Sequence, residues 1–174
     1  SLAQRMSVRM CWTALVAAMF LRHDYHGVEK TVALYEQILQ VERASSATKK
    51  TPQEKLSDEI EISELLMIRN RAIMAQVGQE KRALDDLAEI APRVFDKLAL
   101  QEHKAQLLAK IDPAQGKQAY LELLERNSDN AEYYKALEQL EEDKSKLSEL
   151  YDTLAQKFPK GDLPVSRPLV IFDP

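Results

Sequence analysis

The chain has 174 residues, of which 45% are apolar and 30% charged, so it can bury a core and still carry a polar surface. Its net charge of −4 argues against a general nucleic-acid footprint, and its single cysteine excludes an internal disulfide and a multi-thiolate metal site. Only four glycines, with one Trp, six Tyr and four Phe, argue against a glycine-turned β-barrel or sandwich.

The N-terminal third predicts two helices and then a loop. Apolar side chains recur at the three- and four-residue spacing of one helix face, first before and then after a break at residues 25–27. These side chains are Trp12, Leu15, Val16 and Met19, followed by Val28, Val32, Tyr35 and Leu39. The next segment, 44–57, is polar, contains Pro52 and has no apolar stripe, which predicts a loop.

The rest of the chain predicts six more helices, ended by Pro92, Pro113, the turn-rich residues 127–130 and Pro159. Segment 161–174 contains Pro164 and Pro168, which predicts an irregular tail. The apolar stripes of these helices include Ile62, Leu65 and Leu66; Ala83 and Leu87; Leu100 and Leu107; Tyr120 and Leu123; Tyr133, Tyr134 and Leu137; and Leu147, Leu150 and Leu154. The expected fold class is therefore all-α.

Eight helices with mostly short connections predict antiparallel pairs, and the pairs fit a degenerate tetratricopeptide (TPR) repeat of roughly 34 residues. We expect an α-α superhelix with helix pairs at 1–43, 58–96, 97–127 and 128–160, the polar loop at 44–57 and the tail at 161–174. The expected packing positions are Trp12, Leu15, Val28, Tyr35, Ala83, Leu87, Gly116, Tyr120, Ala136, Tyr151 and Pro159. A compact helical bundle is the alternative architecture.

The inner face of such a superhelix is the candidate protein-binding surface. Residues of the first helix of each pair, between the packing positions, would line it, and the set is small, apolar and nearly uncharged. Its candidate contact residues are Phe20, Ile68, Glu102, Gln106 and Tyr133. An apolar groove favours a helix or a permanent protein partner, and the alternative is that these residues pack within a tightly wound superhelix.

Enzymatic chemistry is not expected in this chain. His23 and His26 flank Asp24, but structural zinc usually needs four ligands, and histidines at a helix end are typical capping or surface groups. No nucleotide-binding glycine loop, H-E-x-x-H or C-x-x-C motif occurs. We therefore expect no catalytic residues, no cofactor and no metal.

The longest apolar run, Met10–Leu21, is shorter than the roughly 20 residues that a membrane span needs. No small-residue cleavage site precedes the polar residues 22–24, so a secretory signal is not expected either. We expect a cytoplasmic protein without a membrane or direct nucleic-acid partner.

Several strings resemble the auxiliary subunit of the NatA N-terminal acetyltransferase. The most specific is Glu125-Arg126-Asn127-Ser128-Asp129-Asn130, followed by Tyr133-Tyr134-Lys135-Ala136-Leu137-Glu138, which is similar to that family's E-R-N-P-E-N-x-x-Y-Y-K-G-L-E. The closing Phe158-Pro159-Lys160-Gly161, with Pro164 and Pro168-Leu169, is similar to its Y-P-R-G…P…P-L. Weaker likenesses are Trp12 through Tyr25, Ile62 through Asn70, Ala83-Leu84 and Phe95 through Leu98.

The resemblance covers nearly the whole chain and is weakest across 44–57. It implies an internal segment of a longer, non-catalytic TPR scaffold that supports a catalytic acetyltransferase subunit and associates with the ribosome. Ser128 stands where the family has proline, Ala136 where it has glycine, and Val165-Ser166 where it has a more basic pair. A generic TPR adaptor that binds a helix or peptide of another partner is the alternative function.

Overall fold

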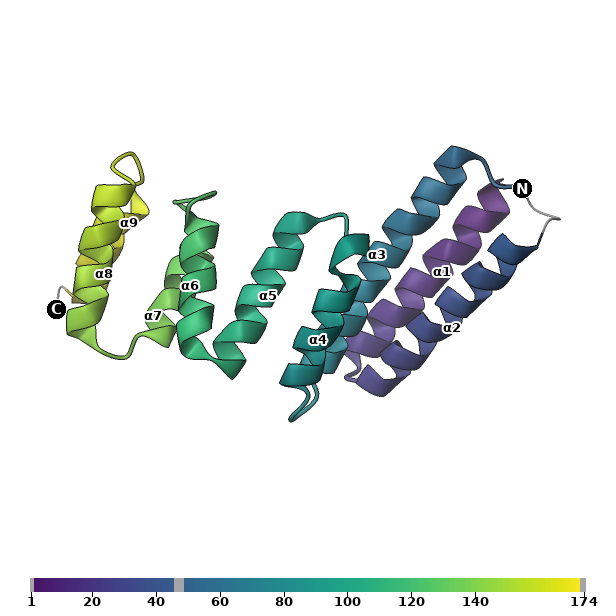
Figure 1. Cartoon of the computed structure of the whole chain (residues 1–174), viewed down its shortest axis with the longest axis horizontal. Coiled ribbons are helices and arrows are strands. Elements are labelled where there is room, and N and C mark those ends of the chain that lie inside the picture. The colour runs from purple at the N-terminus through teal and green to yellow at the C-terminus, as the bar shows by residue number, and fades with distance from the viewer. Residues whose placement is uncertain (1, 46–48, 173–174) are drawn as a thin grey trace. The chain divides into compact units, whose positions relative to one another are not determined.

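The computed structural model describes residues 2–45 and 49–172, and every regular element in these ranges is a helix (Figure 1). The elements are α1 (Leu2–Leu21), α2 (Tyr25–Ala44), α3 (Pro52–Met74), α4 (Glu80–Ile90), the 3-10 turn η1 (Ala91–Arg93), α5 (Lys97–Ile111), α6 (Pro113–Leu124), α7 (Ala131–Leu140), α8 (Lys144–Lys157) and α9 (Leu163–Phe172). The chain divides into two compact units, Ser1–Leu100 (unit 1) and Gln101–Pro174 (unit 2).

Unit 1 begins with the antiparallel pair α1 and α2. The turn between them holds His23 at φ 60°, and Asp24 caps α2 by accepting a hydrogen bond of 3.0 Å from the Gly27 amide. A Cβ at Gly27 would lie 2.3 Å from the Asp24 carboxylate, so a larger residue there would displace this carboxylate from its capping position. The buried side chains at this junction are Val16, Val28, Val32, Tyr35 and Leu39.

The expected loop at 44–57 is wrong in its second half, because α3 begins at Pro52. Thr51 accepts from the Glu54 amide at 3.2 Å, and the Glu54 carboxylate accepts from the Thr51 amide at 2.9 Å. This capping box, with proline at the first helical position, starts the helix before its apolar stripe begins. The periodicity could not show this start because the first turns of α3 are polar.

The second pair of unit 1 is α3 with α4, joined by a turn that contains Gly78 at φ 75°. The 3-10 turn η1, which contains Pro92, follows the second pair of unit 1. Beyond it, the Ser63 hydroxyl accepts from the Phe95 amide at 2.9 Å. The core of these elements contains Ile62, Leu65, Leu66, Ile73, Ala83, Leu87, Ile90 and Val94.

In unit 2, α5 and α6 approach each other closely at one point, Gly116. A Cβ on Gly116 would lie 2.5 Å from the Ala109 Cα, so the two helix backbones lie too close at this point to admit a side chain. Further along, the rings of Tyr134 and Tyr151 stack at 5.8 Å between α7 and α8. The buried cluster comprises Ala105, Tyr120, Leu123, Leu124, Tyr133, Tyr134, Leu137, Leu147, Tyr151 and Leu154.

The expectation of an irregular tail at 161–174 is also wrong, because α9 spans Leu163–Phe172. Asp129, in the turn between α6 and α7, accepts from the amides of Asp162 at 2.9 Å and Leu163 at 3.3 Å. A carboxylate from a distant loop therefore satisfies the orphan donors at this helix start. Pro164 lies in the first turn, where its missing N–H costs nothing, and Pro168 is accommodated inside the helix.

The expected packing positions fall into three groups. Val28, Tyr35, Ala83, Leu87, Gly116, Tyr120 and Tyr151 are buried, and Trp12 and Ala136 are half-buried. Leu15 is 46% exposed and Pro159 is exposed, so the packing role expected for these two is wrong in this structure. No helix within residues 2–45 and 49–172 has both the length and the apolar character to cross a membrane.

Candidate protein-interaction surfaces

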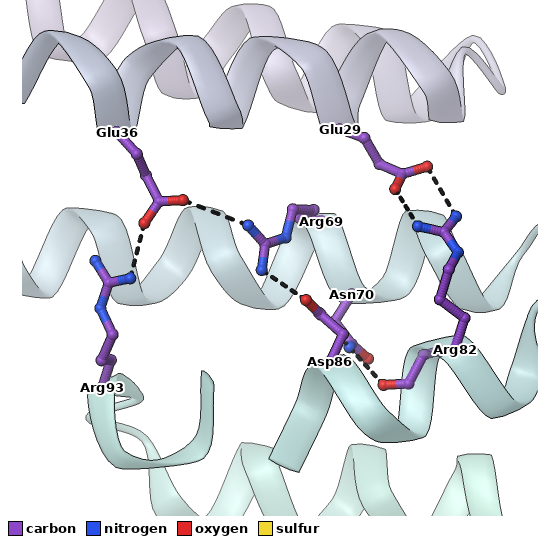
Figure 2. A network of polar contacts seen from close by, with 8 residues as sticks. Glu29, Glu36, Arg69, Asn70, Arg82, Asp86 and Arg93 are labelled. Atoms are coloured by element: carbon purple, nitrogen blue, oxygen red, sulfur yellow. Dashed lines mark hydrogen bonds and ion pairs between the residues drawn. The ribbon is translucent and has the colours of Figure 1, made fainter. Parts of the chain in front are cut away.

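Charged side chains of unit 1 join three helices and η1 in a continuous network (Figure 2). Arg69 of α3 donates to Glu36 of α2 at 3.4 Å and to Asp86 of α4 at 2.7 Å. Arg93 of η1 donates to the second oxygen of Glu36 at 2.7 Å. Because Arg69 and its two acceptors are each less than a quarter exposed, this network is better shielded from solvent than an ordinary surface ion pair.

Asn70 anchors the same network in the core. Its side-chain amide donates to the Ala83 carbonyl and to Asp86, both at 2.8 Å, and the residue is fully buried. A buried amide that satisfies a backbone carbonyl and a carboxylate fixes the register of α4 on α3, since any slip would leave these groups unpaired.

A second ion pair of unit 1 connects α2 with the start of α4. Arg82 donates to both oxygens of Glu29, at 2.6 and 3.1 Å (Figure 2). Gln76 also donates to Glu29, at 2.7 Å. The hydrogen bond from Arg82 lowers the pKa of Glu29 below its ordinary value.

The two expected contact residues in unit 1 are not freely exposed. Phe20 is half-buried and packs its ring edge-on against Tyr25, with ring centroids 5.6 Å apart. Ile68 is half-buried on α3. Neither residue presents a fully accessible apolar side chain in this unit.

In unit 2 the structure brings two of the expected contact residues together. The Tyr133 hydroxyl donates to the Glu102 carboxylate at 2.5 Å, which ties α7 to α5. Tyr133 is only 3% exposed and its ring centroid lies 6.2 Å from that of Tyr120, whereas Gln106 is exposed. A surface role for Tyr133 is therefore contradicted by its burial, and Gln106 is the one member of the expected set that is freely accessible.

Three further residues with the spacing expected of the inner face are also buried. Leu65, Ala72 and Leu137 are 0–1% exposed and belong to the cores of their units. The spacing used for the inner face assumes regular TPR geometry, but in this structure some residues with that spacing are buried in the core. The alternative that these residues pack within the superhelix is the correct one for these three.

Burial and neighbouring carboxylates hold several tyrosines of unit 2 in the protonated form. Burial, together with the hydrogen bond to Glu102, raises the pKa of Tyr133 to about 12. Burial also raises the pKa of Tyr134 to about 12, and its hydroxyl donates to the Ser128 carbonyl at 2.6 Å. Burial, together with the hydrogen bond that the hydroxyl donates to Glu138, also raises the pKa of Tyr151. All three hydroxyls are therefore donors at neutral pH.

The two strings that carry the family resemblance lie against each other in unit 2. Asp129 caps α9 immediately after Gly161, as described above, and Arg167 of α9 donates to both oxygens of Glu138 at 2.7 and 2.9 Å. Four residues thus connect α9 to the α6–α7 turn and to α7: Asp129, Glu138, Gly161 and Arg167. The resemblance therefore marks a packing unit between the α6–α7 turn, α7 and α9.

Sequence analysis missed the buried ion pair at the start of α3. Lys50 donates to Asp58 at 2.7 Å and to Glu42 at 2.9 Å, and the Lys50 and Asp58 side chains are 8% and 1% exposed. Lys50 lies in the segment 44–57 that was expected to be a loop, and Asp58 is the first residue after it, where no apolar periodicity signals burial. His103 is likewise buried on α5.

Two surface hollows lie within single units. One is lined by Glu42, Arg43, Ser45, Lys49, Lys50, Lys55 and Glu59, and the other by Gln101, Lys104, Leu108, Gln115, Gln118, Ala119, Glu122, Leu123, Glu125 and Arg126. Within the first, Arg43 pairs with Glu59 and Lys50 with Glu42, and in the second Arg126 donates to Gln101 at 2.9 Å. The Arg43–Glu59 pair joins α2 to α3, and Arg126, just after α6, connects that end to α5.

The region considered for metal binding is arranged differently from a metal site. His23 Nδ1 lies 2.6 Å from the Tyr25 hydroxyl, and Asp24 is engaged as the cap of α2. Across the ranges 2–45 and 49–172, no group of three or more His, Cys, Asp or Glu side chains is placed to hold a metal ion.

Antiparallel helices whose polar groups connect one helix to the next define a helical-repeat scaffold. This class is supported by a solved structure, the complex of Naa15 and Naa10 bound to HypK-THB. The chain matches one of its chains with a TM-score of 0.66 and 30% sequence identity, over 97% of this chain and 24% of that one. The predicted all-α, TPR-like fold class is thereby confirmed.

The family follows from the sequence comparison. Residues 60–173 match the model of the N-terminal acetyltransferase A auxiliary subunit, and the chain belongs to this family. It is also 25% identical over 171 residues to the human N-alpha-acetyltransferase 16, NatA auxiliary subunit, and 25% identical over 168 residues to the mouse protein of the same description.

These relatives are much longer than this chain. The human match covers 96% of this chain and 18% of the relative, and the mouse match covers 95% and 18%. The chain thus spans about a fifth of the length of the curated relatives that it matches. The resemblance noted in the sequence is confirmed at the level of the family.

Proposed function

We propose that this chain is a non-catalytic scaffold segment of a NatA-type N-terminal acetyltransferase complex, which supports the catalytic subunit. The observation that carries the proposal is the family match over residues 60–173. The arrangement of the polar groups supports it as well, since the charged networks and tyrosine hydroxyls described above connect helices and hold a shape. The solved relative contains Naa15 together with Naa10, which makes a catalytic acetyltransferase the first partner to test.

The decisive experiment is co-expression of the full-length product that contains this chain with the catalytic subunit from the same cell. The expected result is co-purification at fixed stoichiometry and a changed rate or specificity of acetylation on N-terminal peptides. Failure on both counts would refute the proposal. Co-purification with an unrelated helical partner, without any effect on acetylation, would instead favour a generic TPR adaptor.

The non-catalytic part of the proposal has its own test. The isolated chain should show no measurable affinity for acetyl-CoA in isothermal titration calorimetry, whereas the catalytic subunit should bind it. Saturable binding of acetyl-CoA by the isolated chain would contradict the proposed division of roles.

A cytoplasmic location and association with the ribosome complete the proposed function, as the family resemblance implies. Cosedimentation of the full-length product with ribosomes on a sucrose gradient tests the association. The expected signal is loss from the ribosome fraction at high salt, because such contacts between a protein and ribosomal RNA are largely electrostatic.

A further inference from the structure

We propose that Thr51 is a phosphorylation site for a proline-directed protein kinase, and that Lys49 and Lys55 hold the phosphate once it is attached. The proposal rests on the sequence and geometry of the connection between α2 and α3. It goes beyond the proposed function and stands whether or not the chain supports an acetyltransferase. Its consequence is a change of charge at this junction of unit 1.

The sequence singles out the hydroxyl of Thr51. Of the seven prolines in the chain, only Pro52 directly follows a serine or a threonine. A kinase of the proline-directed class accepts proline after the target hydroxyl because its pocket leaves an amide N–H at that position without an acceptor. Any other residue there would bury an unpaired donor, which makes proline the selected residue.

The backbone at Thr51 already has the conformation that a kinase active site binds. Thr51 lies at φ −67° and ψ 159°, which is extended, and the residue is exposed. The ring of Pro52 clashes with a helical conformation of the residue before it, so Thr51 is held extended by its neighbour. The acceptor hydroxyl therefore stands outside the helix that it caps.

The first turns of α3 can open around this acceptor at little cost. None of the residues 52–57 is buried, and the first buried residue of α3 is Asp58. Leu56, the large aliphatic side chain of this stretch, is 51% exposed. A helix end that uncovers little apolar surface opens easily. A kinase can therefore bind the residues on both sides of Thr51 in extended form without disturbing the core of unit 1.

Two lysines beside Thr51 have no carboxylate partner among the residues that the structure describes. Arg43 and Lys50 of the same hollow are engaged, Arg43 with Glu59 and Lys50 with two carboxylates of α2 and α3. Lys49 and Lys55 are exposed and form no such pair within that part of the chain. They are therefore the cations that a new anion at this junction would engage.

The position of these lysines suits a phosphate on Thr51. Both line the first of the two hollows, and Thr51 lies between them in the sequence. Lys55 is four residues after Thr51, on the same side of α3 and one turn along it. Side chains on a helix lean toward its N-terminus, which brings the Lys55 ammonium back toward the cap.

The modification is an ordinary phosphoryl transfer from ATP. Thr51 Oγ1 attacks the γ-phosphorus, the bond from that phosphorus to the oxygen bridging the β-phosphate breaks, and ADP leaves. The hydroxyl proton passes to the catalytic base of the kinase. Residues 49–55 carry three lysines and one glutamate, hence a net charge of +2. A phosphate of roughly −1.5 to −2 charges brings this stretch to about zero.

The phosphate would also replace part of the capping box. Its oxygens can accept from the amides of the first turn, where the helix dipole favours negative charge. The Glu54 carboxylate, which now accepts from the Thr51 amide at 2.9 Å, would be repelled by the phosphate. Lys49 and Lys55 then take over the neutralisation of the helix start, which makes them the residues to test.

Peptide mass spectrometry of the full-length product that contains this chain tests the site. We would incubate the product with ATP and a purified proline-directed kinase and measure phosphate on the peptide that contains Thr51. The expected result is phosphorylation of Thr51 in the native protein, at a rate about tenfold lower in Pro52→Ala. Pro52→Ala keeps the Thr51 cap and places a good helix former at the first helical position, so misfolding does not explain a loss. The same peptide from the product isolated from its own cells, with phosphatase inhibitors present, should carry the phosphate.

A second measurement tests the two lysines. Removal of the phosphate by a broad-specificity phosphatase should be about threefold faster in the Lys49→Gln, Lys55→Gln double variant than in the parent. Both lysines are exposed, so the double variant should fold. The matched control is Lys81→Gln, an exposed lysine of α4 outside the hollow, which should leave the rate unchanged.

Three results would overturn the proposal. One is the absence of phosphate on Thr51, either after treatment with the kinase or in the product isolated from cells. Another is a phosphorylation rate that Pro52→Ala does not change. The third is equal removal of the phosphate from the double variant and the parent, which would exclude the role of the lysines. None of these measurements involves the catalytic subunit or acetylation, so failure here is distinguishable from failure of the proposed function.

Discussion

At the scale of single residues, tyrosine hydroxyls connect helices by donating to acceptors on a neighbouring element. Tyr35 donates to Glu61 at 2.9 Å in unit 1, and Tyr133 donates to Glu102 at 2.5 Å in unit 2. Each ring also contributes buried apolar area, so one side chain both packs and orients its partner helix. A neutral donor next to a carboxylate gives a strong hydrogen bond without burying a second charge.

The raised pKa of Tyr133 predicts a loss of stability in alkali. Folded Tyr133 has a pKa of about 12 against an ordinary value of 10.0, so the folded chain holds this proton more tightly than the unfolded chain. The free energy of unfolding should therefore be fully retained below pH 10 and fall as the pH rises from 10 toward 12, by at most about 2–3 kcal/mol from this group. Denaturant titrations at several alkaline pH values measure it.

Two variants assign this effect to the residue. Tyr133→Phe should reduce the alkaline pH dependence, with Tyr134 and Tyr151 supplying the remainder, and should also cost about 1 kcal/mol at pH 7 through the lost hydrogen bond. Glu102→Gln should reduce the slope only in part, because burial, the largest cause of the raised pKa, remains. An unchanged slope in Tyr133→Phe would show that other groups account for the alkaline loss.

At the scale of helices, the separation of α5 and α6 is set by Gly116. Alanine is usually better than glycine in a helix by about 1 kcal/mol. Here an added Cβ would lie 2.5 Å from the Ala109 Cα and 2.7 Å from its nitrogen, so α5 would have to move. Gly116→Ala should therefore destabilise the chain by about 2 kcal/mol in denaturant unfolding. Gln118→Ala, on the exposed side of the same helix, should be nearly neutral.

The start of α9 depends on a side chain from another part of unit 2. Asp129→Ala removes the acceptor for the amides of Asp162 and Leu163. The free energy of unfolding of α9 should fall by about 1 kcal/mol, with little effect on the other helices. Amide exchange in α9 should accelerate about fivefold while α8 remains protected. Asn130→Ala is the matched control, because Asn130 caps α7 by accepting from the Glu132 amide at 3.0 Å. Faster exchange in α9 from the control variant would contradict the assignment.

At the scale of the whole molecule, each unit has a buried core of its own, and the boundary between the units falls within α5. In repeat proteins stability is roughly a sum of local terms and nearest-neighbour terms. Asn70→Ala, which leaves the Ala83 carbonyl without its buried donor, should therefore raise amide exchange in α3 and α4 more than in α7 and α8. Gly116→Ala should do the reverse. A uniform rise with either variant would show one cooperative unit.

The sequence predicted much of this fold because helix periodicity is local information. The stripes around Val28 and Val32, and around Leu147 and Leu154, correspond to buried faces of α2 and α8. The candidate surface was less predictable. Tyr133 and Leu65 have the spacing of an inner face, but their burial depends on how neighbouring helices pack, which a single helix does not specify.

The amino-acid sequence by itself determined the all-helical class, most helix positions and the family, because these follow from residue spacing and short strings. Only the tertiary structure decided where α3 starts, that the tail forms α9, and which apolar residues face outward. Thr51, Glu54 and Asp129 act through hydrogen bonds to backbone groups that carry no hydrophobic signal. Which sides of α1 and α2 face α3 is likewise seen only from the contacts of Thr13 and Glu36 with α3, since exposure is a property of neighbours in space and not of spacing along the chain.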